Sequence, residues 1–237
     1  MKTAPLITFD FHNTLAHCDT WFQLEIAQLP SAVARKIAPG TDTAALTAAY
    51  REIRKQVMAT GIEQTASEGV SGAFRSLGLD PGDEAIEQQI ETLMRQALYD
   101  LAPVPGAIET VHDLQREGFR LGVVSSAAHH DFLEWALAQF GILHHFRFVL
   151  TSARAGWYKS HPRIYEQALE LGAARASSSM HIGDSLRWDV AMAARAGMRT
   201  GWLESPQRDQ VDAQPDLTFS TLTDAAPRIS NYMRNLP

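Results

Sequence analysis

The stretch ITFDFHNTL, residues 7–15, decides how the rest of the chain is interpreted. Its first residues, together with Leu6, have the apolar and β-branched character of a buried strand, and that strand runs into Asp10. Asn13 and Thr14 follow at once and are typical of a turn. The pattern predicts a strand over residues 6–9 that presents an exposed carboxylate at its C-terminal end, the edge at which open α/β sheets bind ligands.

The composition is that of an ordinary globular protein. The 237 residues are 45% hydrophobic and 20% charged, which is enough for a sizeable core. The net charge of -6 argues against a mainly electrostatic nucleic-acid binder, and the one cysteine, Cys18, excludes an intrachain disulfide. No apolar run reaches the length of about 18 residues that a membrane span needs, and the N-terminal one is too short for a signal peptide. We expect a cytoplasmic protein without nucleic-acid or membrane partners, either a monomer or a homodimer.

Residues 16–102 have a different character from the first stretch. They contain no convincing strand, and apolar residues recur in them at helical spacing. The apolar stripes are Leu46, Ala49, Tyr50, Ile53 and Val57; Val70, Phe74 and Leu77; and Ile86, Ile90, Leu93, Met94 and Leu98. They are separated by helix-ending residues at 39–40, 61 and 78–82. The region predicts an all-helical unit inserted after the first strand, with hinges near residues 16–20 and 102–106.

From residue 103 onward strands and helices alternate. Strands are expected at 119–124, 146–150, 180–182, 199–203 and 217–219, and helices at 107–117, 130–140, 162–171 and 186–196. Repeated β-α units imply a parallel sheet with helices on both faces. We therefore predict an α/β fold: a Rossmann-like core domain from residues 1–15 and 103–237, and an inserted all-α cap domain from residues 16–102.

Four polar positions should meet at one edge of this sheet. They are Asp10, Ser125, the loop that carries Lys159, and Asp184. A carboxylate nucleophile, a hydroxyl beside free backbone N–H groups, a cation and a second carboxylate are the groups that phosphoryl transfer through an aspartyl-phosphate requires. Two neighbouring carboxylates repel each other unless a cation lies between them, and Mg²⁺, which prefers oxygen ligands, suits such a site better than zinc does.

The same residues resemble the motifs of the haloacid dehalogenase superfamily over nearly the whole chain. Its D-x-D-x-[TV] motif appears as DFHNT at residues 10–14, and its hydrophobic strand ending in Ser or Thr appears as LGVVS, which ends at Ser125. Its lysine motif appears in YKSHPRIY as Lys159, and its G-D-x-x-x-x-D motif appears as GDSLRWD with Asp184 and Asp189. The insertion after the first motif resembles the cap of the subclass with α-helical caps.

The resemblance implies a Mg²⁺-dependent phosphatase of a small phosphorylated metabolite. Asp10 would be the nucleophile, and Mg²⁺ would be held by Asp10, Asp184 and the main-chain carbonyl of His12. The residues that would bind the phosphate are Ser125, Ser126 and Lys159. The residues that would support the site are Thr14, Gly183 and Asp189.

His12 departs from the family pattern. Phosphatases of the family carry a second Asp there, which protonates the leaving group and later activates water. The family's dehalogenases also replace that Asp, but they use no Mg²⁺ and lack the Gly-Asp pair that Gly183 and Asp184 preserve here. An imidazole, with an ordinary pKa of about 6.5, can act as acid and base. Two alternatives stay open: a metal-independent hydrolase of the dehalogenase type, and a catalytically weak protein that binds a phosphorylated ligand or partner.

Other conspicuous residues are expected to have structural roles. The histidine pairs at 129–130 and 144–145 should lie at the surface or cap helices. Trp21 and Phe22 follow the first hinge, and they either line a cleft between the two domains or pack inside the helical one. Arg54 and its charged neighbours on the same helix should form a solvated face.

Overall fold

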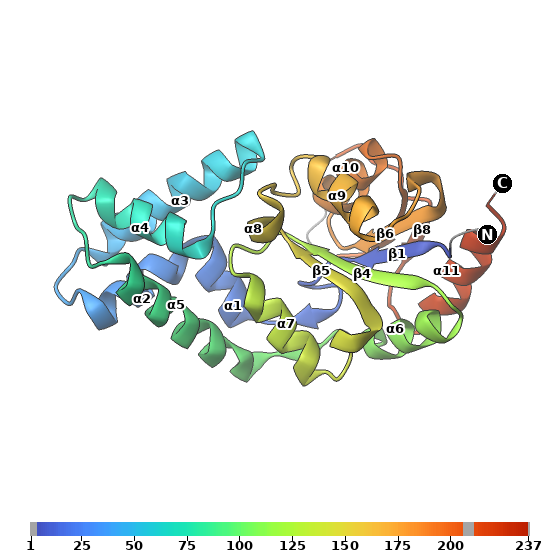
Figure 1. The fold of residues 1–237 in the computed structure, drawn as a ribbon, viewed down its shortest axis with the longest axis horizontal. Helices are drawn as coiled ribbons and strands as arrows, with labels where there is room; N and C mark the ends of the chain where they lie inside the picture. Colours follow the sequence, from blue (N-terminus) through green and yellow to red (C-terminus); the bar gives the residue numbers. More distant parts are fainter. Residues whose placement is uncertain (1–3, 206–210, 237) are drawn as a thin grey trace.

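A computed structural model of the chain describes residues 4–205 and 211–236, and its centre is a six-stranded sheet (Figure 1). The strands are β1 (Leu6–Phe9), β4 (Arg120–Ser125), β5 (Phe146–Thr151), β6 (Ser179–Gly183), β7 (Arg199–Leu203) and β8 (Leu217–Phe219). Their order is β5-β4-β1-β6-β7-β8, and every neighbouring pair is parallel. The predicted α/β fold is confirmed.

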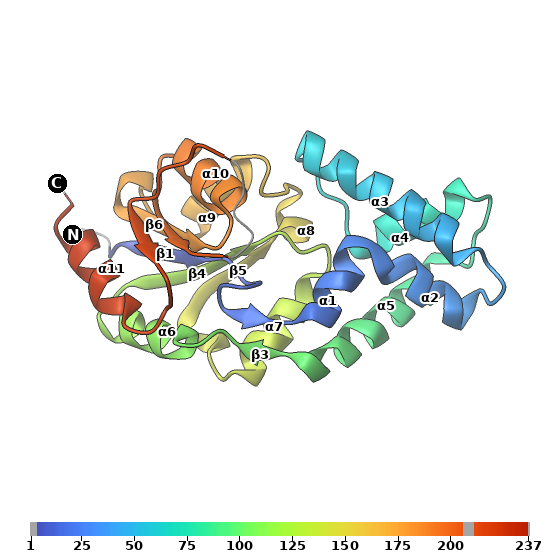
Figure 2. The ribbon, with the colours of Figure 1, turned by 180° about the vertical axis from the view of Figure 1, so that it is seen from behind.

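Helices cover both faces of the sheet, as Figures 1 and 2 show. On one face lie α6 (Ala107–Arg116), α7 (His130–Gln139) and α11 (Ala225–Arg234); on the other lie α9 (Arg163–Leu171) and α10 (Ala191–Arg195). Successive strand residues point to opposite faces. Val123 accordingly packs in one apolar core and Val124 in another. Because both faces are covered, β1 is buried along its whole length.

Two differences between the predicted and the observed elements lie in the C-terminal part of the chain. The C-terminal helix α11 was not expected, although Ala225, Ala226, Ile229 and Met233 face the core at helical spacing. The helix expected at 186–196 begins as a π-helical turn, η5 (Leu186–Val190), before it continues as α10. Short helical turns also occur at α8 (Ser152–Ala155), η3 (Leu143–His145) and η4 (Ala176–Ser178).

The strand order sets the position of a ligand site. β1 lies in the middle of the sheet; the chain adds β4 and β5 on one side of it and β6, β7 and β8 on the other. The direction of winding therefore reverses beside β1. In open parallel sheets, ligands bind outside the C-terminal strand ends at such a reversal.

Residues between the first two strands of the sheet form a helical unit at the end of the molecule away from α11 (Figure 1). Its elements are α1 (Asp19–Gln23), the π-helical turn η1 (Leu24–Gln28), α2 (Leu29–Ile37), α3 (Thr43–Thr60), α4 (Ala66–Ser76), α5 (Asp83–Ala97) and η2 (Leu98–Asp100). Local sequence explains the boundaries. Asp42 accepts hydrogen bonds from the first N–H groups of α3, Gly61 ends that helix in a left-handed conformation, and Thr65 opens α4 with a capping box.

Two very short strands close the base of the helical unit. β2 (Ala16–His17) and β3 (Ala102–Pro103) pair antiparallel at the two predicted hinges. The expectation of no strand within residues 16–102 is therefore wrong at both ends of that range. A two-residue ladder is too short to leave a periodic pattern in the sequence. Among the described residues, no helix combines the length and apolar character that crossing a membrane requires.

Candidate active site

A tight turn after β1 directs the side chain of Asp10 into a cavity. The N–H of Asp10 donates to the carbonyl of Ile182 in β6 at 2.8 Å, and the carbonyl of Phe11 accepts from the N–H groups of Leu15 and Ala16. Asn13 has a φ of 60°, in the left-handed region that Asn adopts more readily than most residues. The turn residues of the sequence pattern thus bend the chain immediately behind the carboxylate.

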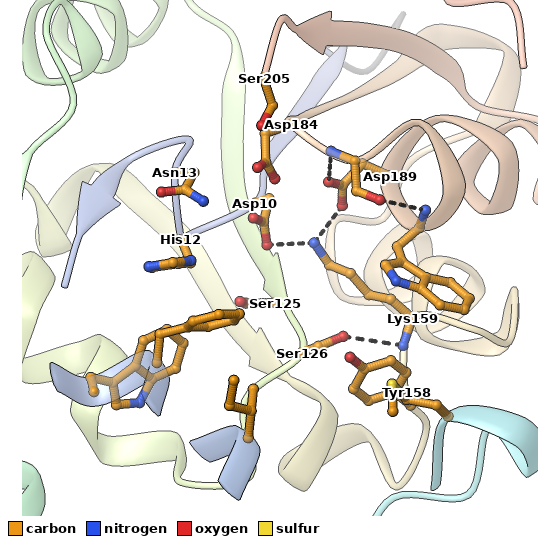
Figure 3. A pocket seen from close by; sticks show the side chains of 16 residues that line it. Asp10, His12, Asn13, Ser125, Ser126, Tyr158, Lys159, Asp184, Asp189 and Ser205 are labelled. Atoms are coloured by element: carbon orange, nitrogen blue, oxygen red, sulfur yellow. Dashed lines mark hydrogen bonds and ion pairs between the residues drawn. The ribbon is translucent and has the colours of Figure 1, made fainter. Parts of the chain in front are cut away.

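Asp10 is buried, with 7% of its surface exposed, so the expectation of an exposed strand-end carboxylate is wrong. The reason is the ammonium group of Lys159, whose Nζ donates to Oδ1 of Asp10 at 2.5 Å and to Oδ1 of Asp189 at 2.6 Å (Figure 3). Burial raises the pKa of Asp10 to about 6 against the opposing effect of Lys159. The Asp10 carboxylate is therefore mostly ionised at neutral pH.

Asp189 is the anion that holds Lys159 in place. Burial raises the pKa of Asp189, but Lys159 and His181 outweigh burial and keep that pKa well below its usual range. His181 Nε2 lies 3.1 Å from Oδ1 of Asp189, and the N–H of Ser185 donates to Oδ2 at 3.0 Å. His181 is bonded on its other side to Thr8 Oγ1 at 2.8 Å. This ordered network fixes Asp189 and, through it, the lysine.

Gly183 and Asp184 end β6 beside this network. A Cβ added to Gly183 would lie 2.2–2.6 Å from atoms of the Asp189 side chain, so only glycine permits the close approach. Burial and the charges of Asp10 and Asp189 raise the pKa of Asp184 to about 8. The three carboxylates have oxygen atoms within 4.8 Å of one another, yet Lys159 bonds only Asp10 and Asp189. Among the described residues, Asp184 therefore has no ion-pair partner.

Two serines line the cavity beside Lys159 (Figure 3). Ser125 is the last residue of β4 and is 2% exposed. Ser126 follows it, and its hydroxyl accepts a hydrogen bond from the backbone N–H of Lys159 at 3.4 Å. The structure thus brings together all the predicted catalytic, phosphate-binding and metal-ligating residues. Thr14 does not line the cavity; its hydroxyl is buried without a hydrogen-bond partner in the described part of the chain.

His12 lies in an aromatic environment at the opposite side of the cavity. Its ring stacks on Phe22 with centroids 4.4 Å apart and an interplanar angle of 8°, and the Trp21 ring lies 5.7 Å away. Its Nε2 is buried and has no partner among the described residues. Burial lowers the pKa of His12 to about 4, so the imidazole is neutral at neutral pH. A flat, uncharged ring fits this stack, whereas a carboxylate would face apolar ring surfaces.

The cavity encloses about 340 Å³ and has two unlike walls. We call Asp10, Ser125, Lys159, Asp184 and Asp189 the sheet wall. We call Trp21, Phe22, Ile26 and Met58 the helix wall; its residues come from α1, η1 and α3. Both π-helical turns contribute lining residues, Ile26 from η1 and Trp188 and Asp189 from η5, in line with the frequent occurrence of such turns at functional sites. Of the two roles considered for Trp21 and Phe22, lining the cleft is the observed one.

Several site residues had no role in the sequence analysis. They are Ile26, Met58, Tyr158, His181, Trp188 and Ser205. His181 did leave a signal, because it is a polar residue inside an otherwise apolar strand that is fully buried. Ile26 and Met58 left none, since apolar spacing does not tell which residue of a helix faces a cleft rather than the core.

Arg54 is buried, and the expectation of a solvated face is wrong for this residue. Its Nη1 donates to Oε1 of Glu63 at 2.6 Å, and the guanidinium group lies 5.8 Å from the ring centroid of Tyr158. Glu63 lies nine positions after Arg54, and side chains at that spacing do not meet on one helix. Two of the histidines behave as expected: His129 caps α7 by accepting the N–H of Phe132, and His144 is exposed. His130, however, is buried between Thr151 and Glu134.

The helical unit also contacts the part of the chain that forms the sheet through residues outside β2 and β3. Glu25 accepts hydrogen bonds from the backbone N–H groups of Ala128 at 2.8 Å and His129 at 3.0 Å, at the start of α7. The carbonyl of Gly61 accepts the N–H of Tyr158 at 2.8 Å. Because Tyr158 precedes Lys159, this contact anchors the lysine loop to the helical unit.

Comparisons with known proteins agree with this geometry. The family described as haloacid dehalogenase-like hydrolase matches residues 4–197. Haloacid dehalogenase-like hydrolase domain-containing protein 3 of Bos taurus is 38% identical over 102 residues, which are 43% of this chain and 40% of that protein. A glyceraldehyde 3-phosphate phosphatase of Methanopyrus kandleri is 29% identical over 152 residues, 64% of each chain. These matches thus span less than two thirds of either relative. The 2-haloacid dehalogenase of Pseudomonas syringae pv. Tomato DC3000 shares the fold, with a TM-score of 0.72, 22% identity, and 97% and 100% of the two chains covered.

Proposed function

The chain belongs to the haloacid dehalogenase-like hydrolases, and we propose that within this family it is a Mg²⁺-dependent phosphatase of a small phosphorylated metabolite. The observation that carries the proposal is the group of three carboxylates around Lys159, with Asp184 forming no ion pair within residues 4–205 and 211–236. Relatives named as phosphatases support the same reaction class. We further propose that residues 1–15 and 103–237 form the catalytic domain, and that residues 16–102 form a cap over it.

The donor set at the sheet wall fits Mg²⁺. The carboxylates of Asp10 and Asp184 supply oxygen ligands, which this ion prefers, and we propose the main-chain carbonyl of His12 as a third ligand. A divalent cation there would remove the repulsion that raises the pKa of Asp184. When bound, it would also withdraw charge from the phosphoryl oxygens and so favour attack on phosphorus.

Asp10 is the nucleophile in the proposed reaction. One of its carboxylate oxygens attacks phosphorus, the bond from phosphorus to the ester oxygen breaks, and the alcohol leaves once that oxygen has taken a proton. Lys159 keeps Asp10 ionised and places positive charge beside the phosphoryl group. Ser125 and Ser126 are placed to bind the phosphoryl oxygens beside it.

His12 is assigned to the second half of the reaction. Water must attack phospho-Asp10, break the bond between phosphorus and the Asp10 oxygen, and lose a proton. A neutral imidazole can accept that proton. Since burial lowers the pKa of His12 to about 4, little imidazolium exists at neutral pH, and the proton for the leaving alcohol comes from solvent in this scheme.

Two other functions have an observation in their favour. A dehalogenase-type hydrolase would use Asp10 on carbon instead of phosphorus, and the apolar helix wall would suit a carbon–halogen bond. A catalytically weak binding protein would need only the charged sheet wall, and the buried, neutral His12 is compatible with slow turnover. The carboxylate of Asp184 favours the phosphatase over the dehalogenase, because only the phosphatase requires a metal ligand there.

Product analysis separates the three functions. Wild-type protein is incubated with a panel of phosphomonoesters and with 2-haloacids, each with Mg²⁺ and with a chelator. We expect release of inorganic phosphate that needs Mg²⁺ and is lost in Asp10→Asn. Metal-independent halide release would establish the dehalogenase function instead. A rise in melting temperature with Mg²⁺ and beryllium fluoride, without turnover of any compound, would establish the binding function.

A further inference from the structure

The helix wall exposes apolar side chains to the cavity. Phe22, Ile26 and Met58 have 37%, 41% and 37% of their surfaces exposed, and all three line it. Large apolar side chains that gather in a cleft and face water lower the free energy of a complex when a ligand covers them. The part of a ligand that points away from the sheet wall therefore meets an apolar surface.

Within the described part of the chain, positive charge is scarce on this surface. Lys159 is the one lysine or arginine among the described residues that line the cavity, and its Nζ is already bonded to Asp10 and Asp189. Two arginines contact lining residues without being part of the described lining. Arg54 is paired with Glu63, and the guanidinium group of Arg187 lies 4.5 Å from the ring centroid of Trp188.

Outside the sheet wall, the polar lining among the described residues consists of neutral groups. It is formed by His12, Asn13, Ser126, Tyr158, Ser185, Trp188 and Ser205. Such groups can bind a hydroxyl or an amide of a ligand, but they do not neutralise an anion. A second anionic group placed against the helix wall would lose its water without gaining an opposite charge, which costs free energy.

We propose that the leaving group of the substrate is apolar and uncharged, so that the substrate class is the monophosphate esters of small apolar or aromatic alcohols without a carboxylate or a second phosphate. The inference rests on the proposed phosphatase function. The phosphoryl group lies at the sheet wall, and the alcohol lies against Phe22, Ile26 and Met58. A cavity of about 340 Å³ is at the small end of ligand sites, which span roughly 300–1,000 Å³. One ring or a short chain fills it.

Three synthetic substrates test the charge preference. Benzyl phosphate, 4-carbamoylbenzyl phosphate and 4-carboxybenzyl phosphate release alcohols of similar reactivity, and the last two have nearly the same shape. We expect wild-type protein to show a kcat/KM for the carbamoyl ester at least about tenfold above that for the carboxy ester. Equal values, or a preference for the carboxy ester, would overturn the inference.

A charge introduced at the helix wall tests where the alcohol lies. Met58→Lys should raise kcat/KM for the carboxy ester relative to the carbamoyl ester by about threefold or more, because the new ammonium group pairs with the carboxylate. Leu77→Lys is the matched control, since Leu77 is also 37% exposed and apolar, belongs to the helical unit and lies outside the cavity lining. An unchanged ratio in a folded Met58→Lys protein would overturn the placement of the alcohol against this wall.

Different results would contradict the proposed substrate class and the proposed phosphatase function. Phosphate released from acetyl phosphate or from any of the three esters, and lost in Asp10→Asn, supports the phosphatase function whatever the ratio of rates. A ratio without the expected preference then overturns the substrate class alone. No phosphate from any substrate, with Mg²⁺ present, overturns the function and the substrate class together.

Discussion

The sheet wall and the helix wall of the cavity are built on different principles. On the sheet wall, charged groups are buried and hold one another: Lys159 lies between Asp10 and Asp189, and His181 and Ser185 fix Asp189. On the helix wall, Trp21 is buried, whereas the apolar side chains of Phe22, Ile26 and Met58 are partly exposed and line the cavity. In the proposed function this difference divides the tasks, since the strand ends carry the reaction and the helical unit selects the alcohol.

The two walls are joined through the backbone. Gly61, at the end of α3, accepts the N–H of Tyr158, and Glu63 donates its N–H to the carbonyl of Gly156. We call these two contacts the joint. It is linked to the helix wall through α3 and to the sheet wall through Lys159. Changes confined to one wall should affect either the reaction or the selection of the alcohol, whereas changes at the joint should affect both.

The largest effect is expected from removing the nucleophile of the sheet wall. Asp10→Asn should lower phosphatase activity by at least about 10⁴-fold, because an amide cannot form the acyl phosphate. Asp212→Asn, an exposed carboxylate outside the cavity, is the control and should leave the rate unchanged. Phosphate release under single-turnover conditions measures both. More than trace activity in Asp10→Asn would show that Asp10 is not the nucleophile. It would also contradict the proposal that the sheet wall carries the reaction.

The next largest effect concerns the metal and the pH. The pKa of Asp184 is raised to about 8, so the folded protein holds its proton more tightly than the unfolded chain does. This group therefore lowers stability progressively as the pH rises from about 4 to about 8. In metal-free buffer at pH 8, Asp184→Asn should melt a few degrees above wild type, and the gap should vanish towards pH 4. Mg²⁺ should stabilise wild type more at pH 8 than at pH 5.

Asp189→Asn is expected to change stability and metal binding differently from Asp184→Asn. The pKa of Asp189 is held below its usual range, so its ionised form stabilises the fold above pH 4 and that contribution is lost only in acid. We expect Asp189→Asn to melt below wild type at pH 8, and to weaken Mg²⁺ binding less than Asp184→Asn does. Isothermal titration with Mg²⁺ and thermal unfolding measure the two effects. Equal loss of metal affinity in the two variants would contradict the assignment of Asp184 as the direct ligand.

The sheet wall could be predicted from the sequence, and the helix wall could not. Asp10 and Asp184 directly follow buried strands and Ser125 ends one, and parallel strands bring their ends to one edge. On helices, the same apolar spacing describes a residue in the core and a residue beside a cleft, so Ile26 and Met58 carried no signal. Contacts across the end of a helix, such as that of Arg54 with Glu63, depend on the path of the chain after α3. No local sequence pattern encodes that path.

His12 lies where the walls meet, and its removal should have an intermediate effect. As a base for the second step, its loss in His12→Ala should slow hydrolysis of phospho-Asp10 by roughly 10²–10⁴-fold while alcohol is still released in the first turnover. Rapid-quench measurements should then show a burst of alcohol without matching phosphate. A variant that matches wild type, with His12→Asp much faster than both, would show that His12 has no acid–base role and would favour the weak-binding alternative.

The smallest effect is expected from Glu25→Gln, where the helical unit contacts the start of α7. Glu25 accepts two backbone N–H groups there, and burial raises its pKa to about 7. At pH 5 the group is therefore mostly a neutral carboxylic acid, which resembles the amide of Gln, so the variant should melt close to wild type. Ionisation makes the wild type less stable as the pH rises from about 4.5 to about 7, whereas Gln does not titrate. The melting temperature of the variant should consequently rise relative to wild type between pH 5 and pH 8, with Glu87→Gln, an exposed glutamate on α5, as the unaffected control. A variant that falls below wild type as the pH rises would mean that the Glu25 carboxylate is stabilised at this contact rather than destabilised by its burial.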